Sequence, residues 1–245
     1  MQTAFVTGGG SGFGAEVARA LHQAGFQTVI GDLNAQAAAA LAAELDPSGE
    51  TVLPITLDVA RADQIQAALD QIIARFGRVE VLVNNAARTA AQPVLEITPE
   101  AFNAVMAVNA GGTFAGSQIF GRHFKANGYG RIINLASLAG QNGGTATGAH
   151  YAASKGAILT LTKVFARDLA PYGVTVNAIA PGPMDTPMVH AVLGAEKLAA
   201  FRAAIPVGQL GDPAFVASLV VLLASPAASF VTGACWDVNG GLYMR

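Results

Sequence analysis

The sequence predicts a single α/β domain built on a doubly wound parallel sheet of about seven strands, with helices on both faces. Three observations predict it. Short apolar, β-branched runs alternate with longer helical stretches along all 245 residues, and most of these runs are apolar on both faces. No linker, repeat or low-complexity tract interrupts the alternation, and 52% hydrophobic residues suffice to bury one core. Repeated β-α-β order with right-handed crossovers then gives one parallel sheet.

The individual elements follow from the local patterns. In chain order the expected strands are Thr3–Thr7, Thr28–Asp32, Val52–Leu57, Val79–Val83, Arg131–Leu135, Val174–Ile179 and Ala234–Val238. The expected helices are Gly14–Gln23, Ala35–Leu45, Ala62–Phe76, Pro99–Gln118, Tyr151–Ala170 and Pro213–Leu223. Thr98 and Asp212, each followed by a proline at the first helical position, are good helix starts. The stretch from Gly182 to Gly211 lies outside this rhythm, and we expect residues 183–210 to form a lid over the sheet.

Composition and charge argue against several functional classes. The sequence has 14 Lys and Arg against 16 Asp and Glu, so it lacks the basic stripe that nucleic-acid binding requires. The longest apolar run, Phe215 to Ala224, is too short to cross a membrane, and Met1 leads into a strand rather than a secretory signal. Cys235 is the single cysteine, which excludes an intrachain disulfide and fits a reducing cytoplasm. The four histidines show no metal-ligand spacing, so we expect no metal site.

A glycine-rich turn follows the first expected strand and has the sequence Thr7-Gly8-Gly9-Gly10-Ser11-Gly12-Phe13-Gly14. Glycines let the backbone approach a pyrophosphate, and the N–H groups at the helix start supply a positive dipole end. An ordinary tight turn has a similar composition, but here the second strand ends in Asp32, where an acid can bind the adenosine ribose. Asp32 repels a 2′-phosphate, and Gly31, Leu33 and Asn34 offer no cation to hold one. The sequence therefore favours NAD(H) over NADP(H).

Further motifs occur in order along the chain: Asn84-Asn85-Ala86, Tyr151-Ala152-Ala153-Ser154-Lys155, Pro181-Gly182 and Asn239-Gly240-Gly241. Together with the Thr-Gly-x-x-x-Gly-x-Gly spacing of the turn, they resemble the short-chain dehydrogenase/reductase family over essentially the whole chain. The resemblance implies a Rossmann-type fold and a nicotinamide-dependent oxidoreductase.

The resemblance also implies which residues bind the cofactor. The pyrophosphate would be held by Gly8, Ser11, Gly12, Phe13 and Gly14. Asp32, followed by Leu33, would lie at the adenosine ribose, and Asp58 and Val59 would face the adenine. The central part would be supported by Asn85, Ala86 and Ala87, the last standing where the family usually has glycine. The nicotinamide would be set by Pro181, Gly182, Met184 and Thr186, with Thr186 reaching its carboxamide.

Four residues form the expected catalytic group. Tyr151 and Lys155 are four positions apart at the start of a helix, so they share a face. A tyrosine with a pKa of ~10 is a poor base near neutral pH, and an adjacent ammonium lowers that pKa. Ser137 closes the fifth expected strand, where its hydroxyl would polarise the substrate oxygen. By resemblance, Asn109 props open its helix and relays protons through water to Lys155, and both Tyr151 and Lys155 also contact the cofactor.

Each of these residues has a structural explanation when taken alone, as a helix cap, a strand end or a solvated side chain. Taken together at the family spacing, they favour catalysis. In alcohol oxidation Tyr151 would accept the hydroxyl proton as hydride leaves the carbon for NAD⁺, and in ketone reduction it would return the proton.

Other functions remain open at this point. A serine hydrolase is disfavoured because neither Ser11 nor Ser137 lies in a Gly-x-Ser-x-Gly elbow. A nucleotide-binding regulator without turnover is compatible with the fold. The ending from Val238 to Met244 resembles 3-oxoacyl-carrier-protein reductases, although Gly128 and Tyr172 stand where those enzymes carry arginines. Other segments resemble NAD-dependent 3-hydroxyacyl-CoA and hydroxysteroid dehydrogenases.

The lid predicts an apolar or aromatic secondary alcohol or ketone as substrate, unless its apolar residues only pack the lid on the sheet. It carries Met184, Met188, Val189, Val192, Leu193, Leu198 and Phe201. Methionine adapts to varied shapes, and no Arg or Lys precedes Lys197 in this segment to bind a charged group. Small residues along the Tyr151–Ala170 helix permit close approach of a second helix, and family members commonly pair this helix. We therefore expect a homotetramer with D₂ symmetry.

Overall fold

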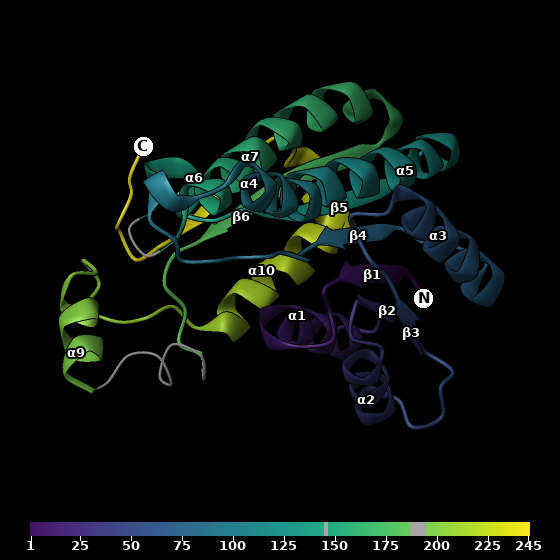
Figure 1. The fold of residues 1–245 in the computed structure, drawn as a ribbon. Helices are drawn as coiled ribbons and strands as arrows, with labels where there is room; N and C mark the ends of the chain where they lie inside the picture. The colour runs from purple at the N-terminus through teal and green to yellow at the C-terminus, as the bar shows by residue number, and fades with distance from the viewer. Residues whose placement is uncertain (145–146, 187–194) are drawn as a thin grey trace.

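The protein is described by a computed structural model that covers residues 1–144, 147–186 and 195–245 (Figure 1). Seven parallel strands form one sheet in the order β3-β2-β1-β4-β5-β6-β7. Their bounds are β1 Thr3–Thr7, β2 Gln27–Asp32, β3 Val52–Thr56, β4 Val81–Asn84, β5 Gly130–Leu135, β6 Val174–Pro181 and β7 Cys235–Val238. The prediction of a doubly wound parallel sheet with seven strands is confirmed.

The strand order fixes where a ligand can bind. The chain starts in the middle of the sheet, proceeds outward through β2 to β3, and returns to place β4 beside β1. Connections on the two sides of the β1–β4 pair therefore run in opposite directions, which opens a crevice at the carboxyl ends of these strands. The glycine-rich turn lies at this point.

Helices cover both faces of the sheet (Figure 1). Their bounds are α1 Gly12–Gln23, α2 Ala35–Leu45, α3 Ala62–Phe76, α4 Pro99–Met106, α5 Gly112–Asn127, α6 Ala139–Asn142, α7 Ala149–Leu169, α9 Ala195–Ala203 and α10 Pro213–Ala224. Helices α1, α2 and α10 pack on one face, and α3, α4, α5 and α7 lie on the other. Each face has its own buried apolar cluster, and in the second one the fully buried rings of Phe5 and Phe120 stack with centroids 5.4 Å apart.

One predicted helix is divided in the structure. The expected helix Pro99–Gln118 consists of α4, a π-helical turn η2 (Ala107–Gly111) and α5, which continues to Asn127. A Cβ atom at Gly112 would lie 2.9 Å from Cγ2 of Val59, so only glycine permits this close packing. The π turn places Asn109 at the widened position, fully buried. Periodicity alone does not reveal one extra residue in a helical turn.

The predicted lid is anchored at its base to the C-terminal segment. Leu198, Ile205 and Leu210 form a small cluster against Leu242, and the Val207 amide donates to the Gly240 carbonyl at 3.2 Å. The expected lid residues Met188, Val189, Val192 and Leu193 lie outside the described residues. For Phe201 only the backbone, within α9, is described.

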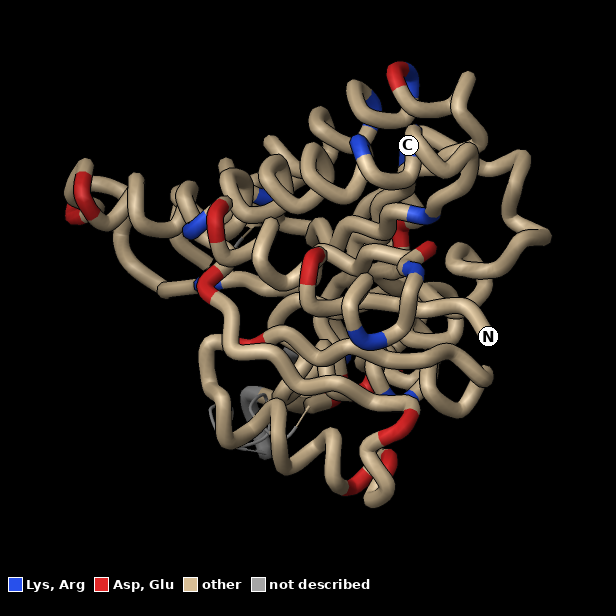
Figure 2. Tube along the Cα trace, turned by 90° about the vertical axis from the view of Figure 1, so that its right-hand side faces the viewer, with Lys and Arg blue, Asp and Glu red and all other residues tan. Residues whose placement is uncertain are grey.

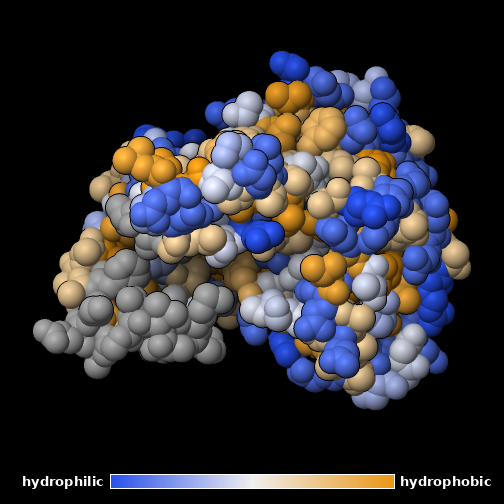
Figure 3. Space-filling model, in the orientation of Figure 1, coloured by the Kyte–Doolittle hydropathy of each residue, from blue (hydrophilic) through white to orange (hydrophobic). Residues whose placement is uncertain are grey.

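Charged residues are sparse, and positive and negative ones are interspersed along the trace in Figure 2. The face in Figure 3 mixes hydrophilic residues with small hydrophobic groups. Within the part of the chain that the structure describes, no helix is both long and apolar enough to span a bilayer.

Candidate active site

The glycine-rich turn forms an open cradle at the start of α1. Gly8 and Gly12 have φ of +62° and +52°, a left-handed conformation that favours glycine. The first turn of α1 has no acidic residue, and its N-cap, Ser11, makes no side-chain capping hydrogen bond. Ser11 and Gly12 are exposed, Phe13 is half-buried and Gly14 is buried. The helix N-terminus is therefore available to an anion, which fits the pyrophosphate of a dinucleotide.

Asp32 lies at the end of β2 and braces this cradle. Its Oδ2 accepts from the Gly10 amide at 2.8 Å, and its Oδ1 accepts from the Asn34 amide at 2.9 Å. A Cβ at Gly10 would lie 3.0 Å from Oδ2 of Asp32, so glycine allows this contact. Leu33 beside it is 72% exposed, a large apolar side chain open to a ligand. The predicted ribose acid thus has a second task, which is to position the phosphate loop.

Asn85 and Ala86 support the turn from β4. The Asn85 carboxamide donates to the carbonyls of Thr7 and Gly8 at 3.0 and 2.9 Å, and a Cβ on Gly8 would lie 2.7 Å from Cα of Ala86. The Asn85 side chain therefore acts on the cofactor site through the loop. Ala87 is exposed, so its methyl group is accommodated where the family usually has glycine.

Asp58 and Val59 follow β3 at the same edge of the sheet. The Leu57 amide donates to the Asp32 carbonyl at 2.9 Å, which brings this segment beside the ribose acid. Asp58 is half-buried, whereas Val59 is buried against Gly112. Of the two, Asp58 has the side chain more accessible to an adenine.

Tyr151 and Lys155 lie in the first turns of α7, which begins at Ala149. The ammonium of Lys155 is 5.6 Å from the centroid of the Tyr151 ring and donates to the Leu135 carbonyl at the end of β5, at 2.5 Å. Lys155 is only 3% exposed. This burial holds a cation next to the phenol and fixes it on the sheet.

Burial controls the protonation of Tyr151 and Lys155. Against the expectation that Lys155 lowers it, the pKa of Tyr151 is raised by burial, and a hydrogen bond with the Ser137 hydroxyl partly opposes this. Burial lowers the pKa of Lys155 to about 8. Near neutral pH Tyr151 is therefore protonated and able to donate a proton.

Ser137 lies two residues beyond β5, between the tyrosine and the nicotinamide segment. Its Oγ accepts from the Ala139 amide at 3.1 Å, which starts the short helix α6 that the sequence did not predict. The Leu138 amide donates to the Pro181 carbonyl at 2.9 Å, so the end of β6 runs beside Ser137. The structure thus brings the expected nicotinamide segment to the catalytic side.

The nicotinamide segment continues from β6 toward the lid. The Gly182 amide donates to the Val238 carbonyl at 2.8 Å, and Met184 pairs in an isolated bridge with Gly211. Pro181, Gly182, Met184 and Thr186 are all half-buried. These contacts hold both ends of the lid at the carboxyl edge of the sheet.

Asn109 joins the π turn to the catalytic helix. Its Oδ1 accepts from the Arg88 amide at 2.7 Å, and its Nδ2 donates to the Arg88 carbonyl at 3.0 Å and to Ser154 Oγ at 2.9 Å. Ser154 in turn donates to the Tyr151 carbonyl at 2.7 Å. The side chain of Asn109 is committed to these bonds, so it positions Arg88 and the start of α7.

Sequence reasoning missed three residues of this arrangement. Ser154 links Asn109 to Tyr151, and its place in the Tyr-Ala-Ala-Ser-Lys motif was the available signal. Thr7 accepts from the Asn85 and Ala86 amides through Oγ1, at 3.1 and 3.2 Å. Arg88 follows β4 and carried no pattern that set it apart.

His150 is 1% exposed, and its Nδ1 accepts from the Tyr151 amide at 2.9 Å, so it packs the helix start.

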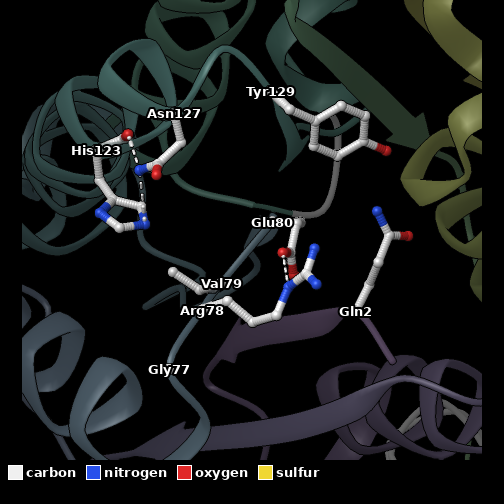
Figure 4. A pocket seen from close by; sticks show the side chains of 8 residues that line it. All are labelled: Gln2, Gly77, Arg78, Val79, Glu80, His123, Asn127 and Tyr129. Carbon is white, nitrogen blue, oxygen red and sulfur yellow. Dashed lines mark hydrogen bonds and ion pairs between the residues drawn. The ribbon is translucent and has the colours of Figure 1, made fainter.

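A separate cavity of about 540 Å³ lies at the opposite, amino edge of the sheet (Figure 4). There Arg78 pairs with Glu80, which also accepts from the Thr3 amide at 2.8 Å. Asn127 folds back on His123 and donates to its carbonyl at 2.8 Å. Because these groups are largely satisfied by one another, and the glycine cradle and Tyr151 lie elsewhere, we place the chemistry at the carboxyl edge.

Comparison with known proteins agrees with this geometry. The sequence model of a family described as enoyl-(acyl carrier protein) reductase matches residues 8–243. The 4-formylbenzenesulfonate dehydrogenase of Comamonas testosteroni is 40% identical, over 98% of this chain and 97% of the relative. The 3-oxoacyl-(acyl-carrier-protein) reductase of Vibrio cholerae is 38% identical, over 99% and 98%. The chain belongs to the short-chain dehydrogenase/reductase family.

The fold agrees with that of a solved member of the family. A crystal structure of a short chain dehydrogenase from Bacillus anthracis superposes with a TM-score of 0.90, at 30% identity, over 100% of this chain and 97% of that one. Short-chain dehydrogenase/reductases are oxidoreductases that use a nicotinamide cofactor, and the predicted family is confirmed.

Proposed function

We propose that this short-chain dehydrogenase/reductase is NAD(H)-dependent and interconverts a secondary alcohol and a ketone on an apolar or aromatic substrate. The observation that carries the proposal is the grouping of Tyr151, Ser137 and Lys155 at the carboxyl edge of the sheet, the same edge as the glycine cradle. When bound, the nicotinamide cofactor accepts a hydride from the substrate carbon or returns it. Tyr151 moves the hydroxyl proton, Ser137 binds the substrate oxygen, and Lys155 supplies the positive charge that favours the phenolate.

The aromatic substrate class has two lines of support. The described lid segment includes Met184, an apolar side chain that is only half-buried. The relative from Comamonas testosteroni is named for an aromatic aldehyde. The direct test is to mix the protein with NAD⁺ and a panel of secondary alcohols and to follow the absorbance of the reduced cofactor. Binding of NAD⁺ without turnover of any alcohol or ketone would instead indicate a nucleotide-binding regulator.

A second candidate is a 3-oxoacyl reductase or 3-hydroxyacyl dehydrogenase acting on carrier-protein or CoA thioesters. The family description and the relative from Vibrio cholerae favour it. The same residues would serve this reaction, since it also converts a ketone to a secondary alcohol. Reduction of acetoacetyl-CoA in preference to aryl ketones would favour the 3-oxoacyl reductase over the alcohol dehydrogenase.

The preference for NAD(H) is expected to be at least about tenfold in kcat/KM, or ~1.4 kcal/mol. The reason is the negative charge of Asp32, which would lie against a 2′-phosphate. Asp32→Asn keeps one acceptor oxygen for the Gly10 amide but removes the charge, so it should narrow the preference. Asp32→Ala should narrow the preference and also weaken NAD(H) binding, because the hydrogen bond from the Gly10 amide to the side chain is lost. Steady-state kinetics with both cofactors measures this, and equal use by the unaltered enzyme would contradict the proposal.

We also propose a homotetramer with D₂ symmetry. On the outer side of α5 and α7, Phe114 is 44% exposed and its ring lies 5.8 Å from that of Phe165, beside exposed Val164. Such an apolar group is suited to pairing with a second copy across a two-fold axis. Light scattering at micromolar concentration should give about four times 24.8 kDa, and a mass of 24.8 kDa alone would refute the proposal.

A further inference from the structure

Arg88 lies on the segment that follows β4, with its backbone fixed and its charge unpaired among the described residues. Asn109 holds both polar backbone atoms of Arg88, with bonds of 2.7 and 3.0 Å. The side chain of Arg88 is exposed, and its guanidinium makes no hydrogen bond or ion pair with any residue that the structure describes. The surface arginines Arg61, Arg167 and Arg245 each pair with an aspartate, whereas Arg122 on α5 is, like Arg88, exposed and without a side-chain partner among the described residues.

The segment that carries this arginine runs along the start of the catalytic helix. The Gly148 amide, at the N-cap of α7, donates to the Ala90 carbonyl at 3.0 Å. On the other side, Asn109 links Arg88 through Ser154 to the Tyr151 carbonyl. Arg88 is thus fixed beside the turn of α7 that presents the proton-transfer residue.

The chemistry of a guanidinium defines the ligand. Arginine is always charged, and its planar fork matches a carboxylate or a sulfonate with two parallel hydrogen bonds. A cation without a partner among the described residues, on a backbone fixed beside the turn that carries Tyr151, is suited to an anionic group on the substrate. The pyrophosphate of the cofactor is the other anion in reach, but it has its own binding place at the first turn of α1.

We propose that Arg88 binds a carboxylate or sulfonate carried by the substrate at a distance from its reacting hydroxyl. This inference rests on the proposed function and narrows it, from apolar alcohols to aromatic or alicyclic alcohols that also bear an anionic group. The apolar lid would cover the ring, and Arg88 would fix the charged end and thereby the orientation of the hydroxyl toward Tyr151.

The test compares an acid with its ester, which differ mainly in charge. With NAD⁺, the unaltered enzyme should oxidise 4-(1-hydroxyethyl)benzoate with a kcat/KM at least about tenfold above that for the methyl ester. Arg88→Ala should remove this preference by lowering kcat/KM for the acid, with the ester changed less than about twofold. Arg88→Lys should retain part of it. Arg75→Ala removes an exposed positive charge on α3, where Arg75 donates to the Gly49 carbonyl, and should leave both values unchanged.

A binding measurement without turnover separates this inference from the proposed function. Calorimetry should show 4-acetylbenzoate binding to the enzyme with NAD⁺ at least about tenfold more tightly than its methyl ester, and Arg88→Ala should abolish that difference. Failure of all alcohols to react would overturn the function while leaving this binding result standing. Equal binding or no binding of acid and ester would overturn the role of Arg88, as would an Arg88→Ala protein that loses NAD⁺ affinity but keeps the preference for the acid.

Discussion

Tyr151→Phe is expected to lower kcat by roughly 100-fold or more while NAD(H) binding is retained. The substitution removes the hydroxyl group, the only group through which Tyr151 can exchange a proton with the substrate. Because burial raises the pKa of this phenol, Tyr151 at neutral pH holds the proton that ketone reduction consumes. Stopped-flow or steady-state assays with the best alcohol and ketone measure turnover, and fluorescence titration with NADH measures binding.

Two further variants make this result interpretable. Tyr172→Phe removes the same atom from a tyrosine that is 40% exposed on the surface, and it should leave turnover unchanged. Lys155→Ala should lower both turnover and cofactor affinity, since its ammonium supports the phenolate and, by the family resemblance, holds the nicotinamide ribose. A Tyr151→Phe enzyme with near-normal kcat would show that the proton is exchanged elsewhere.

Gly14→Ala is expected to abolish cofactor binding and to destabilise the fold by at least about 2 kcal/mol. A methyl group at Gly14 would overlap the Gly8 carbonyl oxygen and the Asn85 side-chain nitrogen. Both atoms belong to the cradle itself, so the loop has to move to admit the methyl group. Calorimetric titration with NAD⁺ and thermal unfolding measure the two effects.

Gly111→Ala is the matched control because it adds the same methyl group to a glycine with space around it. The nearest atom to a Cβ at Gly111 is the Met106 carbonyl oxygen at 3.6 Å, an ordinary van der Waals contact. This variant should bind NAD⁺ and unfold like the unaltered protein. If Gly14→Ala also did so, the close approach of α1 to the loop would not be needed for the cofactor site.

Most of the fold could be predicted because parallel strands covered on both faces are apolar throughout, as Val81–Asn84 and Val174–Pro181 are. The division of the expected helix 99–118 could not be predicted in this way. It coincides with the close packing of Gly112 against Val59, two residues that are distant in sequence. Helix α6 was missed because it is only four residues long, too short to show a helical period.

The candidate site shows the same division. Tyr151 and Lys155 could be placed on one face from their spacing alone. The end of β5 lies against α7, and this packing leaves Lys155 only 3% exposed. The burial in turn lowers the pKa of Lys155. Arg88 was not predicted to matter, since nothing in its neighbourhood in the sequence shows that Asn109 fixes its backbone.

The sequence by itself determined the fold class, the family and the chemical groups of the site. Local spacing and hydrophobic periodicity carry that information, because they depend on residues within one strand, turn or helix. Only the tertiary structure decided what these groups do to one another. Asp32 braces Gly10, Asn109 joins Arg88 to the catalytic helix, and burial sets the charge state of Lys155. These relations arise where separate elements meet at one edge of the sheet, so hydrogen-bond partners and solvent exposure follow from packing and not from neighbours in the chain.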